Sequence, residues 1–159
     1  MKIEKLMTRK VAVCNSQDTL EYAASLMWDN DCGCLPVMDS NDAARLCGMI
    51  TDRDICMSAL FNGRALGALR VEDAMARDVQ TCQPDDTIVE GERKMQNARI
   101  RRMPVVDKAG ALVGIVSMAD LAIEASRLQY AQHQEVPATQ VTTTLAAICK
   151  PAGDRMAAA

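Results

Sequence analysis

The sequence predicts a mixed α/β fold, of the α+β type, in which two copies of one β-α-β-β-α unit pack with pseudo-twofold symmetry. Three observations lead to this prediction. A stretch of about 60 residues recurs in register along the chain. In each copy, a segment with apolar residues at helical spacing follows a short extended segment. Two short apolar strands joined by turn residues come next, as is typical of a β-hairpin.

The internal repeat is the clearest of these signals. The matched segments are residues 18–19 with 86–87 and 35–39 with 103–107, both at a spacing of 68, and 48–55 with 114–121 at a spacing of 66. The spacing changes because the first copy has two extra residues in the turn around residues 41–46. One such unit buries little surface on its own, so we expect the two copies to share a core.

Each copy opens with an extended segment, residues 11–14 in the first and 79–82 in the second. A polar turn follows, and we expect Asp18 and Asp86 to cap the next helix, because a carboxylate accepts hydrogen bonds from the free amides of a first turn. The apolar positions of the two helices that follow are Leu20, Ala23, Ala24 and Met27 in the first copy, and Ile88 and Met95 in the second.

A β-hairpin and a second helix complete each copy. The predicted strands are residues 34–38 and 46–50 in the first copy and 102–106 and 112–116 in the second, with turns at 39–42 and 107–110. The second helices are expected to open near Asp52 and Met118.

The repeat also sets the expected division of the chain. Residues 1–65 form the first repeat, residues 66–127 form the second, and residues 128–159 form a tail. Within the tail, residues 129–140 are polar and are predicted to be a loop, whereas residues 141–149 are predicted to form a short amphipathic helix.

Composition excludes several classes of protein. The chain carries 18 Lys and Arg against 21 Asp and Glu, so it has no global positive field for nucleic acid or anionic lipid. Aromatic residues make up 3% of the chain, too few for a surface that stacks single-stranded bases. No apolar run reaches the length of a membrane-spanning helix and the N-terminus leads into no signal core, so a cytoplasmic protein is expected.

Enzyme chemistry is not expected. The single histidine, His133, lies in a polar stretch, which disfavours catalysis by a nucleophile and a histidine base held together by a third group. No P-loop and no cluster of metal ligands is visible. The seven cysteines are expected to be reduced thiols packed as small apolar residues, and the matching repeat positions of Cys14 and Cys82 favour that interpretation.

The repeated pattern Leu/Met-Pro-Val-x-Asp, followed by Gly-x-Ile/Val-Thr/Ser-x-x-Asp-Ile/Leu, resembles the tandem cystathionine-β-synthase (CBS) domain pair, or Bateman module. The resemblance covers residues 4–126. It implies two repeats packed through their sheets, two clefts between them, and modules that pair into a disc-like homodimer. Clefts of this family commonly bind AMP, ADP, ATP, S-adenosylmethionine or a dinucleotide, and binding usually regulates an attached or partner protein. Because no enzyme domain accompanies the repeats, a stand-alone module is expected.

The residues of this pattern suit an adenosine ligand chemically. Asp54 and Asp120 carry carboxylates that can accept both ribose hydroxyl groups. Thr51 and Ser117 stand three residues earlier at a helix start, where a hydroxyl and free amides can donate to a phosphate. The same spacing is also a helix-capping arrangement that needs no ligand, and both roles can hold for the same side chains.

Basic and apolar residues complete the expected site. In this family, basic residues just before the Pro of the pattern often point at the phosphates of the ligand. The resemblance therefore implies this role for Arg101 and Arg102, and Arg53 is a third candidate. An exposed charge cluster is the alternative. Gly48 and Gly114 permit close approach of the backbone. The expected adenine slot is lined by Val13, Thr81, Pro36, Val37, Ile50, Pro104, Val105 and Val116.

The two copies differ at the expected phosphate site. Where the second copy has Ile-Arg-Arg at residues 100–102, the first has Cys-Gly-Cys at residues 32–34, so one cleft is expected to bind tightly and the other weakly or with another ligand. Cys32 and Cys34 allow three interpretations: strand packing, a redox-responsive thiol pair, or part of a metal site. Packing is favoured and no metal site is predicted, because a second ligand pair is missing.

The expected function is therefore that of a non-catalytic regulatory module, a signal or energy sensor that binds AMP or ATP, with ADP, NAD or S-adenosylmethionine as further candidates. No cofactor beyond this regulatory nucleotide is required. The expected partners are a second copy in a homodimer and an unidentified protein, with no nucleic acid and no membrane. Two alternatives stay open: a ligand-free interaction scaffold and a thiol redox switch at Cys32 and Cys34.

Overall fold

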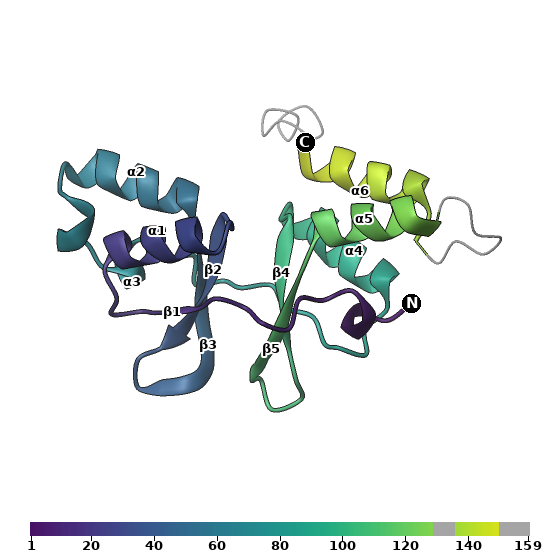
Figure 1. Cartoon of the computed structure of the whole chain (residues 1–159), viewed down its shortest axis with the longest axis horizontal. Coiled ribbons are helices and arrows are strands. Elements are labelled where there is room, and N and C mark those ends of the chain that lie inside the picture. The colour runs from purple at the N-terminus through teal and green to yellow at the C-terminus, as the bar shows by residue number, and fades with distance from the viewer. Residues whose placement is uncertain (129–135, 150–159) are drawn as a thin grey trace, which may run out of the picture. The chain divides into compact units, whose positions relative to one another are not determined.

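Two discontinuous units make up the computed structural model, which describes residues 1–128 and 136–149 (Figure 1). The first-repeat unit comprises Lys10–Val79 and Asp107–Val113, and the second-repeat unit comprises Met1–Arg9, Gln80–Val106 and the chain from Gly114 onward. Short strands alternate with helices along the chain, so the predicted α+β class is confirmed. The repeat boundaries at residues 65 and 127 stay a prediction.

A three-stranded sheet lies in the first-repeat unit. Strand β1 (Cys14–Asn15) pairs in parallel with β2 (Cys34–Asp39), and β2 pairs in antiparallel fashion with β3 (Asp42–Thr51). The sequence predicts this hairpin, but β3 begins four residues before the predicted start at residue 46, because Asp39 already pairs with Asp42 and the turn is limited to residues 40–41. The extended segment expected at residues 11–14 is paired only at its end, because ladder pairing begins at Cys14.

Helices α1 (Leu20–Asp29) and α2 (Asp52–Asn62) accompany this sheet. The buried residues of α1 fall on the predicted apolar stripe, and α2 opens at Asp52 as expected. Helix α2 ends at Gly63, whose φ of 58° is a left-handed conformation that glycine adopts without strain. The core of the unit consists of Cys14, Leu20, Ala23, Met27, Leu35, Val37, Ile50, Ile55, Leu69, Val71 and Met75.

The second copy of the repeat forms a two-stranded sheet of β4 (Arg102–Val106) and β5 (Leu112–Ser117). The strand predicted at residues 79–82 is reduced to one parallel bridge between Cys82 and Val105, so that prediction is wrong for the rest of the segment. Within residues 79–82, Cys82 is the residue whose backbone pairs with β4. Its N–H donates to Pro104 O at 3.1 Å, and its carbonyl accepts from Val106 N at 2.9 Å.

The α-helices described in the second-repeat unit are α4 (Ile88–Ala98), α5 (Met118–Leu128) and α6 (Ala138–Cys149). Figure 1 shows α6 lying alongside α5 and α4. Helix α6 begins three residues before its predicted start, so the loop expected at residues 129–140 is wrong for 138–140. Residues 129–135 of that loop, with His133, lie outside the described residues.

The caps of α1 and α4 correct a sequence prediction. The N-cap residues are Thr19 and Thr87, one position after the expected aspartates, because each threonine hydroxyl accepts from the amide three residues later. The aspartates close the preceding turns instead: Asp18 Oδ2 accepts from Asn15 N at 2.7 Å, and Asp86 Oδ2 accepts from a backbone amide at 3.0 Å.

The segment that precedes each copy of the repeat packs in the unit of the other copy. Residues 1–9 and residues 69–77, called here the leader segments, match at the same spacing of 68. The leader that precedes the first copy packs in the second-repeat unit, and the leader that precedes the second copy packs in the first-repeat unit. Equivalent backbone hydrogen bonds fix them: Ile3 N to Asp86 O (2.9 Å) and Thr8 N to Ile115 O (2.9 Å), and Val71 N to Asp18 O (2.9 Å) and Ala76 N to Met49 O (2.8 Å).

The helices of the described chain are short, none longer than the 12 residues of α6. None of those within residues 1–128 and 136–149 has both the length and the hydropathy needed to cross a bilayer.

Candidate functional site

The Thr51–Asp54 motif lies where β3 gives way to α2. Thr51 is the N-cap of α2, and its hydroxyl accepts from Asp54 N at 3.2 Å. In return, Asp54 Oδ2 accepts from Thr51 N at 2.9 Å and from Thr51 Oγ1 at 2.7 Å. This reciprocal capping box satisfies amides that a helix start otherwise leaves unpaired, which explains why the sequence folds this way locally.

The Ser117–Asp120 motif repeats this geometry between β5 and α5. Asp120 Oδ2 accepts from Ser117 N at 2.8 Å and from Ser117 Oγ at 2.6 Å, and Asp120 N donates to Ser117 Oγ at 3.2 Å. The capping role considered from the sequence is therefore present in both copies. In each box only Oδ2 is engaged, and no donor among the described residues reaches the second carboxylate oxygen. That oxygen leaves each motif an acceptor for a ligand hydroxyl.

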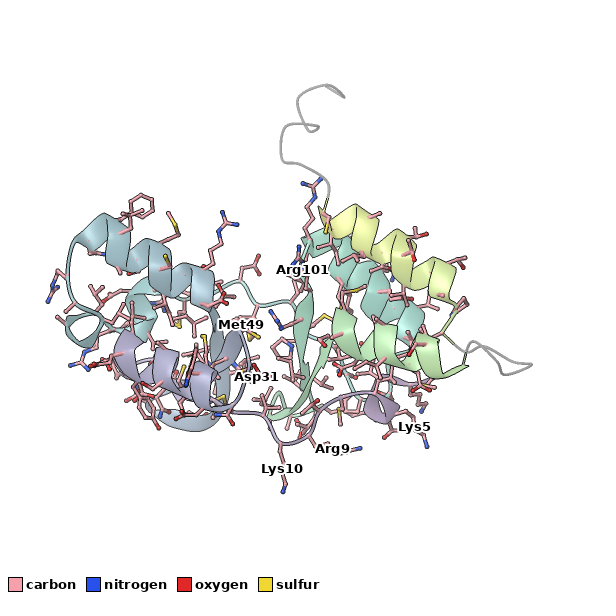
Figure 2. The ribbon with its side chains drawn as sticks, turned by 45° about the horizontal axis from the view of Figure 1, so that its top comes forward. Lys5, Arg9, Lys10, Asp31, Met49 and Arg101 are labelled. Carbon is pink, nitrogen blue, oxygen red and sulfur yellow. The ribbon has the colours of Figure 1, made fainter. Side chains whose placement is uncertain are left out.

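Arg101 lies directly beside the Ser117–Asp120 motif. Its carbonyl accepts from Met118 N at 2.9 Å, which ties the start of β4 to the first turn of α5. The Arg101 side chain (Figure 2) is exposed, and its Nη2 donates to Cys149 Sγ at the end of α6 at 3.5 Å. Arg102 is exposed at the first position of β4. The second-repeat unit thus ties the backbone of Arg101 to the start of α5, while the exposed Arg101 side chain contacts the end of α6.

The first copy keeps the backbone contact but lacks the cation. Asp52 N donates to Gly33 O at 3.3 Å, the bond equivalent to that between Met118 and Arg101. Glycine carries no side chain there, and the nearest expected cation is Arg53, which is exposed on α2. The difference between the copies that the sequence predicts therefore has a defined place in the fold.

The residues expected to line an adenine slot divide into two groups. Val13 is 39% exposed and Thr81 is half-buried, each one position before the cysteine that pairs with a central strand. The other six side chains are buried within their own units: Pro36, Val37, Ile50, Pro104, Val105 and Val116. Burial gives these side chains a place in the core, so only the backbone of their strands is left to approach a ligand.

Lys94 is a residue of this region that sequence reasoning missed. Its Nζ donates to Thr81 O at 3.1 Å and to Asp86 Oδ2 at 2.8 Å, which anchors the segment carrying Thr81 to α4. Burial opposes ionisation of Asp86, but hydrogen bonds from Lys94 and Gln83 N outweigh it and lower the pKa of that carboxyl. The first copy has Leu26 at the equivalent position. The replacement of an apolar helix residue by lysine was the sequence signal that could have revealed this contact.

Three of the seven cysteines, Cys14, Cys34 and Cys82, are buried packing residues, but Cys56 and Cys149 are exposed, so the prediction that all seven pack as apolar residues is wrong for these two. Burial raises the pKa of the Cys14 and Cys82 thiols to about 12, so both are protonated and unreactive near neutral pH. Cys34 is buried in β2 and Cys32 is half-buried before it. Within residues 1–128 and 136–149, no group of three or more His, Cys, Asp or Glu side chains is placed to hold a metal ion.

Comparison with known proteins identifies the repeat. The family model of the CBS domain matches residues 3–60 and 71–126. The CBS domain-containing protein YhcV of Bacillus subtilis is 35% identical over 121 residues, which cover 76% of this chain and 83% of that protein. A match of 33% identity to homoserine O-acetyltransferase of Methanococcoides burtonii covers 75% of this chain but only 23% of that longer protein.

Solved structures agree with the fold. The crystal structure of Hypoxic Response Protein I with two coordinated zinc ions has a TM-score of 0.69 at 30% identity, and the match covers 77% of this chain and 98% of that one. The CBS domain pair of protein MJ0100 in complex with 5′-methylthioadenosine and S-adenosyl-L-methionine has a TM-score of 0.68 at 27% identity, covering 81% and 99%. With two matched repeats and these neighbours, the chain belongs to the family of tandem CBS domain pairs.

Proposed function

We propose that this chain is a non-catalytic regulatory module that binds an adenosine-containing ligand. The observation that carries the proposal is the Ser117–Asp120 capping box with Arg101 beside it. The free oxygen of Asp120 can accept from a ribose hydroxyl. The Arg101 guanidinium and the first-turn amides of α5 can donate to a phosphate. The complex of the MJ0100 CBS pair with two adenosine compounds supports the same ligand class.

The charge of the site favours a phosphate-bearing ligand. Arg101 and Arg102 are both exposed, and neither forms an ion pair with a described acidic residue. Two such cations attract AMP or ATP, whereas they repel the sulfonium of S-adenosylmethionine. AMP and ATP are therefore the first candidates, with ADP, NAD and S-adenosylmethionine behind them. The first copy, with Gly33 in place of Arg101, is expected to bind such ligands more weakly.

Isothermal titration and thermal-shift measurements with AMP, ATP, NAD, S-adenosylmethionine and adenosine test the proposal. AMP or ATP is expected to bind more tightly than adenosine by about 10- to 100-fold, the worth of a hydrogen-bonded charged contact. Asp120→Asn is expected to weaken binding, while Asp54→Asn serves as the matched change in the copy without the arginine. Absence of heat and of thermal shift with all five compounds would contradict the proposal and favour the scaffold alternative.

A second observation favours an interaction role beside ligand binding. Helices α1 and α2 pack together and present large exposed apolar side chains, Tyr22, Trp28, Leu60 and Phe61, with Trp28 86% exposed. Exposed aromatic residues of this kind mark protein contact surfaces. We infer that these helices contact a second copy in the homodimer that the family resemblance implies. Light scattering of Trp28→Ser with Phe61→Ser is expected to give a monomer, and an unchanged mass would argue against this surface.

A further inference from the structure

Helix α6 covers α4 and α5 with a surface that carries no charge. Its buried residues, Val141, Thr144 and Ile148, form one stripe at helical spacing, and Ala138–Cys149 contains no Asp, Glu, Lys, Arg or His. Apolar contacts and hydrogen bonds from the buried stripe therefore hold the helix in place. Among the described residues beneath α6, a polar network is centred on Thr144.

That network buries a glutamate. Glu92 of α4 is 1% exposed, and its Oε1 accepts from Thr144 Oγ1 at 3.3 Å. Its other oxygen, Oε2, is buried and has no hydrogen-bond partner among the described residues. Thr144 Oγ1 also accepts from Gln96 Nε2 at 2.7 Å and donates to Gln140 O at 3.0 Å. An ionised carboxylate here would be a buried charge with no cation facing it.

Counting hydrogens decides which form of Glu92 the network fits. A threonine hydroxyl has one hydrogen, and two acceptors, Gln140 O and Glu92 Oε1, compete for it. If Glu92 is protonated, its own hydroxyl can donate to Thr144 Oγ1, whose hydrogen then serves Gln140 O. Thr144 then accepts from Gln96 and Glu92 with its two lone pairs. In the neutral form each of these contacts therefore has its own hydrogen, whereas in the ionised form the two acceptors share the single hydroxyl hydrogen of Thr144.

The surrounding charged groups do not change this balance. On α4, Glu90 is held in the capping box of Thr87, Lys94 is bound to Thr81 and Asp86, and Arg93 is exposed. On α5, Asp120 is engaged with Ser117, and Glu124 adds a further negative charge; the leader carries Lys2, Glu4 and Lys5. Burial raises the pKa of Glu92, hydrogen bonds from Thr144 and Gln140 oppose that rise, and no charged group contributes.

We propose that α6 is a proton-operated latch, which lies on α4 and α5 while Glu92 carries a proton and detaches when Glu92 ionises. The docked form holds the proton more tightly than the detached form, in which water reaches the carboxyl. The stabilisation of docked α6 is therefore complete at acidic pH and is lost as pH rises through the pKa of the docked Glu92. This inference does not depend on nucleotide binding.

Only one repeat carries the latch. At the positions equivalent to Glu92 and Gln96, helix α1 has Ala24 and Trp28, so the first copy lacks both the buried acid and the amide that orients Thr144. Helix α1 therefore serves as an internal reference that experiences the same pH change without the switch.

Hydrogen exchange of the full chain, followed by mass spectrometry and corrected for intrinsic exchange rates, tests the latch. Protection of the α6 amides is expected to fall as pH rises above the usual range of a glutamate, about tenfold for each unit by which docking raises the Glu92 pKa. The α1 amides are expected to keep their protection. Glu92→Gln, whose amide can donate to Thr144 as the neutral acid does, is expected to keep α6 protected throughout.

Glu90→Gln is the matched control, because it removes an acid from the same helix and glutamine still completes a capping box. It is expected to behave as the wild type. Constant α6 protection across the pH range in the wild type, or an equal loss in Glu92→Gln, would overturn the latch. As a measurement that needs no variant, a carbon NMR titration of the Glu92 carboxyl should show a midpoint that coincides with the loss of α6 protection; well-separated midpoints would also overturn it.

Discussion

Ile3 and Val71 hold equivalent places in different units. Ile3 precedes the first copy but packs in the second-repeat unit, whereas Val71 precedes the second copy but packs in the first-repeat unit. Ile3 N donates to Asp86 O in the second-repeat unit, and Val71 N donates to Asp18 O in the first-repeat unit, both at 2.9 Å. Both side chains are at most 1% exposed. The leader that precedes each copy thus closes the unit of the other copy. The second-repeat unit is closed by a segment far from its other elements in sequence, whereas residues 69–77 directly follow the helices of the first-repeat unit.

Truncation of either leader anchor should destabilise the unit in which it is buried. Ile3→Ala is expected to lower the free energy of unfolding by about 2–5 kcal/mol, the usual cost of such a core deletion. Val71→Ala should cost less, because it removes fewer carbon atoms. Hydrogen exchange should locate the effects in α4 for Ile3→Ala and in α1 for Val71→Ala. The reverse assignment would contradict the exchange of leaders.

Two glycines make room for the exchanged leaders. A Cβ at Gly48 would lie 2.5 Å from Met75 Sδ and 3.1 Å from Ala76 O, and one at Gly114 would lie 2.9 Å from Met7 Sδ and 3.0 Å from Thr8 O. Gly48→Ala and Gly114→Ala are each expected to cost about 1–3 kcal/mol of stability in urea unfolding. In Gly67→Ala, the added Cβ meets only the flexible end of Glu21, so this control should change stability little.

Arg101 should discriminate nucleotides from nucleosides. Arg101→Leu removes the guanidinium while the Arg101 carbonyl still accepts from Met118 N, so the fold of the motif is kept. The affinity for AMP is expected to fall by about 10- to 100-fold, with the affinity for adenosine unchanged. Arg53→Leu in the first copy is the comparison. Equal losses for AMP and adenosine in titrations would show that Arg101 does not contact the phosphate.

Thiol reactivity should follow burial. With pKa values of about 12, Cys14 and Cys82 are expected to resist alkylation by iodoacetamide in the native protein at neutral pH, since the thiolate is the reactive form. Cys56 and Cys149 are exposed and should react first. Peptide mass spectrometry of native and urea-unfolded samples measures the order. Fast native labelling of Cys14 would show that its unit opens readily.

Repetition made much of the fold predictable from the sequence. Both hairpins, the starts of α2 and α5 at Asp52 and Met118, and most of α6 follow from apolar spacing and turn residues. The cap positions were missed by one residue because aspartate and threonine are adjacent and both are good capping residues. Such local ambiguity is settled only by where the helix amides point.

Other features depend on contacts between distant parts of the chain. The local pattern of residues 1–9 matches that of residues 69–77, but it cannot say which repeat each segment packs on. Glu92 stands on the buried stripe of α4 with Ile88, Gly91 and Met95, and an acid at an apolar position was the one signal of a buried polar network. The ribose and phosphate roles of Asp120 and Arg101 stay predictions.

The exchanged leaders also bear on how such a protein arises. A single repeat that carried only the leader in front of it, as residues 1–68 do, would hold a leader fitted to the other copy and would lack the one that closes its own unit. It could complete its fold only by exchanging leaders with a second molecule, as in a domain-swapped dimer, and its stability would then depend on protein concentration. When two repeats are joined in one chain, the intermolecular exchange becomes an intramolecular contact at high effective concentration. Duplication and fusion would thus have made folding independent of finding a partner.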